Sequence, residues 1–373
     1  MDSEKTKQKL SRASDTADAS LSKMDRISKK KQKLSESQVI ASPSLSKEEL
    51  QKAMKKQNAA ALDLTRKVIA SEARHSNFVF SPASISAALT MMAAENGFGS
   101  DKLNAVYSEI ATVVFADGSA SGGPKISAVN GVWVEQSLPV DISLKDLVVN
   151  IFKATFTQVD FISKAEEVRI ELNKWASDHT NGLIRDLLPP GSVNPSTKKV
   201  YGNALYFKGA WKDEFKNLQR FQGPWTTIPT RLHDDADRKF SMYFYLPDKK
   251  DGLDNLLEEM TSTPGFLDRH IPKYRVEVGD FRIPKFNFSF EFEASRALEG
   301  EVKVMYHKAC VEIDEQGAEA AAVTFLCFSG GALGCKPPPK RIDFVADHPF
   351  LFLIREDTTG TVLFSGQIYD PSR

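Results

Sequence analysis

The residue types that carry out most enzyme chemistry are present, but their spacing matches none of the common catalytic or metal-binding patterns. The segment from Gly118 to Gly122 reads GSASG, with alanine where a GxSxG enzyme has its nucleophile. The glycine-rich segment from Gly330 to Gly334 lacks the Lys-Ser/Thr pair of a phosphate-binding loop. The histidines show no metal-ligand spacing; they are His75, His179, His233, His270, His307 and His348. We therefore predict no catalytic residues, no metal site and no cofactor.

The three cysteines, Cys310, Cys327 and Cys335, lie late in the chain, and none forms a CxxC pair. Free thiols in a reducing compartment are one interpretation. The alternative is a disulfide between Cys327 and Cys335, which would restrain the segment between them.

The most distinctive stretch runs from Glu315 to Pro339 and reads EQGAEAAAVTFLCFSGGALGCKPPP. Small residues come first and leave the backbone free to change conformation. A β-branched and aromatic run, Val323–Phe328, follows and could form a strand. Glycines and three prolines end it, and proline lacks the N–H that a sheet interior requires. A strand-capable segment outside a sheet favours aggregation unless it has a use, such as later insertion as an extra strand.

Two long motifs at the ends of this stretch resemble the plant serpins (Z-type), members of the serine protease inhibitor superfamily. They are EQGAEAAA at 315–322 and DFVADHPFLF at 343–352. Further matching segments are NFVFSPASISAAL at 77–89, NALYFKGAWKDEF at 203–215 and GTVLFSGQIYDP at 360–371. The resemblance covers about residues 48–373.

The resemblance implies an α+β serpin fold: a large central mixed β-sheet, smaller β-sheets, surrounding helices and an exposed reactive-centre loop. We expect a serpin domain at 48–373, with the reactive-centre loop at about 315–341. In the family this loop is bait for a protease. After cleavage it inserts into the central sheet as a new strand and deforms the attached enzyme.

The resemblance also assigns roles to individual residues. The hinge residues are Glu315, Gly317, Ala318, Glu319, Ala320, Ala321 and Ala322. Counting forward from the hinge places the scissile bond at Gly331-Ala332, whereas counting back from Ile342 places it at Leu333-Gly334. The residues expected where the central sheet opens are Ser84, Asn203 and His348, with His348 hydrogen-bonded near the other two as part of a structural switch.

Residues 1–47 are rich in serine and lysine, lack aromatic residues and are expected to form a disordered tail. The basic cluster at 29–33 is either a solvated charge run or a nuclear-import signal. We find no apolar segment like a signal peptide, which predicts a cytoplasmic or nucleocytoplasmic protein. By family analogy an extracellular location stays open. The net charge of zero argues against a nucleic-acid surface, no apolar run could span a membrane, and we expect a monomer.

Local patterns predict the main secondary-structure elements. Helices are expected from Lys47, with Ser46 as N-cap, and at 83–94, 172–184 and 255–260. Strands are expected at 78–80, 128–136, 200–206, 239–247, 282–292, within 302–313 and 342–354, and at 360–371.

Three segments are shorter than the family pattern: 97–105, 216–238 and 298–304. Loss of sheet strands would expose apolar faces and unpaired edges and would release stored strain. We therefore predict a serpin with impaired or absent inhibition. The alternative is an active suicide-substrate inhibitor of a serine or cysteine protease that prefers a small or apolar residue at the cleavage position.

Overall fold

The computed structural model describes residues 46–95, 101–209, 221–222, 225–232, 234–235, 237–271, 278–284, 287–294, 305–313 and 342–370. The chain divides into two units, Met1–Ser44 and Leu45–Arg373. All the elements below belong to the second unit. The predicted hinge, the scissile-bond candidates and the basic cluster at 29–33 lie outside the described residues.

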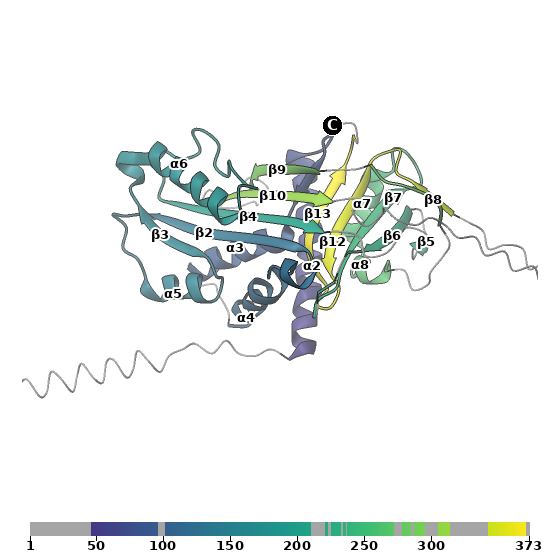
Figure 1. Ribbon diagram of the computed structural model, residues 1–373, viewed down its shortest axis with the longest axis horizontal. Helices are drawn as coiled ribbons and strands as arrows, with labels where there is room; N and C mark the ends of the chain where they lie inside the picture. Colours follow the sequence, from purple (N-terminus) through teal and green to yellow (C-terminus); the bar gives the residue numbers. More distant parts are fainter. Residues whose placement is uncertain are drawn as a thin grey trace, which may run out of the picture. The chain divides into compact units, whose positions relative to one another are not determined.

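A five-stranded mixed sheet, here called the central sheet, lies on the left of this unit in Figure 1. In spatial order its strands are β3 (Thr155–Val159), β2 (Lys125–Glu135), β4 (Lys199–Gly209), β10 (Met305–Ile313) and β9 (Asn287–Glu293). The pairs β2–β3 and β4–β10 are parallel, and the pairs β2–β4 and β10–β9 are antiparallel. The mixed sheet confirms the predicted α+β class.

A second sheet is antiparallel throughout. In spatial order its strands are β1 (Phe78–Phe80), β13 (Thr361–Ile368), β12 (Phe350–Glu356), β7 (Phe240–Pro247), β6 (Trp225–Arg231) and β5 (Phe221–Gln222). A small sheet pairs β11 (Ile342–Val345) with β8 (Val278–Arg282) in parallel.

Helices surround these sheets, and a capping side chain precedes α2, α5 and α6. They are α2 (Lys47–Glu72), α3 (Pro82–Glu95), α4 (Asp101–Glu109), α5 (Ile142–Asn150), α6 (Phe161–His179), α7 (Leu253–Ser262) and α8 (Phe266–Arg269). The predicted cap Ser46 is confirmed: it forms a capping box with Glu49 at the start of α2.

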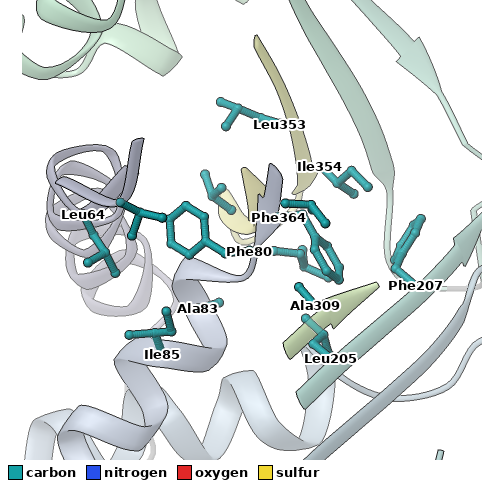
Figure 2. Close-up of a cluster of buried hydrophobic side chains, with 14 of the residues drawn as sticks. Leu64, Phe80, Ala83, Ile85, Leu205, Phe207, Ala309, Leu353, Ile354 and Phe364 are labelled. Atoms are coloured by element: carbon teal, nitrogen blue, oxygen red, sulfur yellow. The ribbon is translucent and has the colours of Figure 1, made fainter. Parts of the chain in front are cut away.

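The main core lies between the central sheet, the antiparallel sheet, α2 and α3. Figure 2 shows side chains from all of these elements meeting there, including Leu64, Phe80, Leu205, Phe207, Ala309 and Phe364. The rings of Phe207 and Phe364 lie 5.9 Å apart, centroid to centroid. The core therefore joins the two sheets through strands that are distant in sequence.

A smaller core covers the opposite face of the central sheet, beneath α6. Trp133 of β2 meets Trp175 of α6 edge-on, with ring centroids 4.8 Å apart. Trp175 is partly buried and packs against this cluster. A Cβ on Gly202 of β4 would lie 2.7 Å from a Trp133 ring carbon, so glycine there leaves room for the indole.

Two predicted elements were wrong in extent. The expected strand at 282–292 is two strands, β8 and β9, separated by Ile283-Pro284 and the residues after them, because proline interrupts a ladder. The expected helix at 172–184 is α6, which begins much earlier, at Phe161, and ends at His179. Asn181 and Gly182 follow it with positive φ, as a helix stop requires.

Candidate functional site: the boundary between β4 and β10

The boundary between β4 and β10, here called the seam, is a parallel pairing of two inner strands of the sheet. Its register pairs Met305 with Tyr201 and Ile313 with Gly209. The residues of the predicted loop follow β10 directly in the chain. A strand folding back from Ile313 would run antiparallel to both β10 and β4. It would replace one parallel pair by two antiparallel pairs, and antiparallel pairing is slightly more stable per residue.

A buried polar cluster crosses the seam on its core face. We call it the inner cluster; its members are Ser81, Ser84, Asn130, Asn203 and His307. Asn203 of β4 and His307 of β10 are register partners, and His307 Nδ1 lies 2.6 Å from Asn203 Oδ1. Ser84 Oγ donates to the same oxygen over 2.6 Å, and Asn203 Nδ2 donates to the Ser84 carbonyl over 3.1 Å. Asn203 Nδ2 also donates to Asn130 Oδ1 of β2.

These contacts determine the proton positions on His307. Its Nε2 accepts the backbone N–H of Ser81 over 3.0 Å, so Nε2 carries no proton. Nδ1 must then carry the proton and donate to Asn203 Oδ1. The imidazole is neutral, and both ring nitrogens are satisfied.

Burial reinforces this neutral state. His307 is 1 % exposed, and desolvation lowers its pKa from 6.5 to about 3. A proton on Nε2 would face the Ser81 N–H, donor against donor. The seam is therefore held together by an imidazole that must remain uncharged.

The start of α3 positions the serines of the inner cluster. Ser81 precedes Pro82, and its hydroxyl accepts the Ser84 N–H over 3.1 Å, as a helix N-cap does. The Ser81 N–H itself lies outside the helix ladder, and His307 satisfies it. The segment SPAS thus connects α3 to the strands β4 and β10.

The structure brings together two of the three residues predicted for this region. Ser84 and Asn203 are in direct contact. The expected position of His348 was wrong. Its Nε2 lies 2.6 Å from the Pro247 carbonyl of β7, and its Nδ1 lies 2.7 Å from Asp347 Oδ1.

The histidine of the seam is His307, which the sequence reasoning did not select. A signal for it exists in the strand pattern. Met305, His307, Ala309 and Val311 share one face of β10, and all are buried. A histidine in an otherwise apolar buried row needs polar partners.

On the opposite face of the sheet, the neighbouring residue Lys308 also makes contacts beyond its own strand. Its Nζ lies 3.0 Å from the Asp186 carbonyl in the segment between α6 and β4, and 2.6 Å from Glu291 Oε2 of β9. Cys310, two residues further on, is half-buried.

Within the described parts of the chain, no group of acidic, histidine or cysteine side chains is arranged to hold a metal ion. None of the helices described is both long and apolar enough to cross a bilayer.

Comparison with known proteins agrees with this geometry. A family model described as "Serpin (serine protease inhibitor)" matches residues 55–234 and 295–371. Serpin-Z2 of Arabidopsis thaliana is 50 % identical over 418 positions, covering 100 % of this chain and 98 % of that protein. The "Probable non-inhibitory serpin-Z5" of the same plant is 53 % identical over 373 positions, covering 87 % of this chain and 86 % of that protein.

A solved structure titled as Arabidopsis AtSerpin1 in its native stressed conformation is also similar. It shares 38 % identity and a TM-score of 0.78, covering 87 % of this chain and 99 % of that one. The alignment to Serpin-Z2 uses all of this chain, yet it spans 418 positions against 373 residues here, so it must open gaps inside this chain.

Proposed function

Because the chain belongs to the serpin family, we propose that it keeps the serpin frame but does not form a lasting covalent complex with a protease. It would act by binding a partner, neither as an enzyme nor as an effective suicide inhibitor. The observation that carries this proposal is the missing sequence. The internal gaps against Serpin-Z2 support the shortened segments that the chain itself suggests.

The small sheet offers a physical reason why a shortened frame would impair inhibition. β11 follows the predicted loop and anchors its downstream end. It consists of Ile342–Val345, and its described strand partner is β8, in a parallel pairing with a register shift after Ile342. Within the described residues this anchor rests on one strand partner and on Phe344, which is buried against Phe244 of β7. Fewer strands beside the loop would leave the scissile bond less firmly positioned for a protease.

The predicted loop tip also argues against effective inhibition. At Gly331-Ala332 a glycine would offer no side chain to a specificity pocket. Leu333, the other candidate, would suit an apolar pocket. The likeness to a relative named as probably non-inhibitory adds support.

A second candidate function is active inhibition, and the seam favours it. Five strands, a parallel β4–β10 pair and a fully hydrogen-bonded inner cluster are what a metastable sheet needs in order to stay closed until cleavage. The partner would then be a serine or cysteine protease that accepts a small or apolar residue. We expect the chain to act as a monomer, in the cytoplasm or the nucleocytoplasm, without nucleic acid or membrane.

A denaturing gel separates the two candidates. The full chain is mixed with an elastase-like and a chymotrypsin-like protease, with Ala320→Arg as a hinge variant that should not insert. We expect loop cleavage, full residual protease activity and no band of higher mass. A covalent complex with the unmodified chain that is absent with Ala320→Arg contradicts the proposal and supports inhibition.

A further inference from the structure

His348 lies in the short segment that joins β11 to β12, residues 346–349, which we call the connector. Its Nε2 lies 2.6 Å from the Pro247 carbonyl oxygen at the end of β7, and its Nδ1 lies 2.7 Å from Asp347 Oδ1. The His348 side chain is only 10 % exposed. The imidazole is therefore largely shielded from water and has an oxygen atom beside each of its two nitrogens.

Both of these oxygen partners are hydrogen-bond acceptors. A backbone carbonyl has no proton to donate, and an ionised carboxylate has none either. Asp347 is ionised, since the hydrogen bond from His348 holds the pKa of its carboxyl group below the ordinary value. Two acceptors require two donors, so both ring nitrogens of His348 carry a proton and the side chain is a charged imidazolium. His307 is the opposite case, because its Nε2 accepts a backbone N–H and its ring is neutral.

The charge on His348 is compensated by its neighbour Asp347, whose side chain is 53 % exposed. In the turn after β7, Lys250 approaches the other oxygen of the same carboxylate, with Nζ 3.5 Å from Oδ2. The two cations therefore use different oxygens of Asp347. The remaining charged residues of this turn cancel the charge of Lys250; they are Asp248, Lys249 and Asp251.

The charged groups at the adjoining end of the small sheet are paired among themselves. Arg282 Nη2 lies 2.7 Å from Asp280 Oδ2 on the same strand, β8. Asp343 Oδ1 of β11 accepts the Asp280 N–H over 2.8 Å. The balance of charge at His348 is thus set by Asp347 and, more weakly, by Lys250.

The connector joins two sheets, and His348 provides one of its two attachments. The Ala346 N–H donates to the Arg282 carbonyl at the end of β8 over 2.9 Å, which ties the connector to the small sheet. The hydrogen bond from His348 to Pro247 ties it to β7 of the antiparallel sheet. Because β11 directly follows the predicted reactive-centre loop in the chain, these attachments fix the position of the strand at the downstream end of that loop.

Loss of one proton from His348 would break the attachment to β7. A neutral imidazole has a single N–H, and that proton is best kept on Nδ1, where it faces the negatively charged Asp347 carboxylate. Nε2 would then direct a lone pair at the Pro247 carbonyl oxygen from 2.6 Å, which is repulsive. The connector would have to move away from β7.

We propose that protonated His348 fastens the downstream end of the reactive-centre loop to β7, and that loss of one proton releases it. Imidazoles change charge near neutrality, so the release falls between about pH 6 and about pH 8. Its sign is opposite to that at the seam, where His307 must stay uncharged. The proposal rests on the serpin frame but not on whether the protein inhibits a protease.

The charge itself is tested by ¹H–¹⁵N NMR spectra of the full chain labelled at histidine. The signals of the two residues are assigned by their loss in His348→Arg and in His307→Asn. At pH 6 we expect both ring nitrogens of His348 to be protonated and only one ring nitrogen of His307. A neutral His348 at pH 6 would overturn the proposal.

The release is tested by hydrogen exchange at pH 6 and pH 8, corrected for the intrinsic effect of pH on exchange. A peptide covering 342–349 reports the connector, and one covering 361–368 is the internal reference. From pH 6 to pH 8 the connector peptide should lose protection about tenfold, since a hydrogen bond from a charged donor is lost. In His348→Arg, which keeps a charged donor at both pH values, the loss should be under about twofold, as in the reference peptide.

Asp347→Asn tests the same device with the histidine in place. It removes the counter-charge, so the connector should already be loosened at a lower pH than in the unmodified chain. This variant also decides the question if His348→Arg does not fold.

Two matched controls keep the interpretation specific to His348. Lys250→Met removes the other ion pair of Asp347 and should leave the response to pH within about twofold of that of the unmodified chain, because this pair is exposed. His270→Gln changes another histidine that contacts a backbone carbonyl, that of Phe266, and should leave the connector unchanged. The proposal fails if His348→Arg and the unmodified chain lose equal protection, if the reference peptide responds as strongly, or if Asp347→Asn leaves the pH of release unchanged.

Discussion

Acid should weaken the seam through His307, and the size of the effect follows from its burial. In the folded chain the pKa of His307 is lowered from 6.5 to about 3. Between pH 6.5 and about pH 3 the His307 imidazole is protonated in the unfolded chain but stays neutral in the folded chain. Stability from this site is therefore fully present above pH 6.5 and is lost as the pH falls towards 3.

The expected loss can be worked out by linkage. Between pH 7 and pH 5, a site with these two pKa values loses about 2 kcal/mol of unfolding free energy. The reason is structural: a second proton on the ring would meet the Ser81 N–H, and a side chain that is 1 % exposed is shielded from the bulk solvent that would stabilise the charge. Opening of the seam without global unfolding would follow the same dependence, because it also exposes the ring.

The assay is urea unfolding at pH 7 and pH 5 for the unmodified chain and for His307→Asn. Asparagine retains a donor towards Asn203 but cannot titrate, so the variant should lose about 2 kcal/mol less between the two pH values. At pH 7 it should be about 1–3 kcal/mol less stable than the unmodified chain, because the Ser81 N–H loses its acceptor. The exposed His75, changed to asparagine, serves as the control.

Carboxylates also titrate near pH 5, so both proteins lose some stability on acidification for other reasons. The quantity to measure is therefore the difference between the unmodified chain and His307→Asn in the unfolding free energy lost from pH 7 to pH 5. If His307→Asn shows the same loss on acidification as the unmodified chain, the neutral, buried imidazole is not what makes the seam acid-sensitive.

Three further substitutions test the local structure, each measured by chemical denaturation. Asn203→Ala should cost about 2–4 kcal/mol, because it leaves buried groups of Ser84 and His307 without partners; a cost under about 1 kcal/mol would show that the inner cluster contributes little. Gly202→Val should cost about 1–3 kcal/mol, since its side chain would overlap the Trp133 ring, while unchanged stability would mean that the indole can move aside. Ser46→Ala should cost about 1 kcal/mol by removing the capping box of α2, and no loss would indicate that the first turn is already frayed.

Much of the fold could be predicted because local patterns carry it. Three predicted features match observed elements: the apolar triplet at 78–80 is β1, the Ser46 cap begins α2, and the alternating segment at 239–247 is β7. The start of α6 was missed although Asp160 caps it by accepting the Ser163 N–H over 2.9 Å. The split between β8 and β9 was signalled by Pro284 and was overlooked in a continuous alternating pattern.

The site was harder to predict because it depends on register. Ser84 and Asn203 are 119 residues apart in the chain, and Asn203 and His307 are 104 apart. No local sequence pattern predicts that β4 and β10 pair, or that Asn203 and His307 lie opposite each other. His348 was chosen for its place in a family motif. The pairing of β4 with β10 instead places His307 opposite Asn203.

The melting temperature before and after cleavage of the reactive-centre loop bears most directly on the inference that the shortened frame has lost the stored strain that drives loop insertion and a lasting complex. A protease that cuts within 331–334 is used, and the cleaved, undissociated chain is compared with the intact one by calorimetry. We expect the two temperatures to agree within a few degrees, because no strand enters between β4 and β10. A large rise on cleavage would mean that the loop has inserted and that the stored strain is intact, which contradicts the proposal.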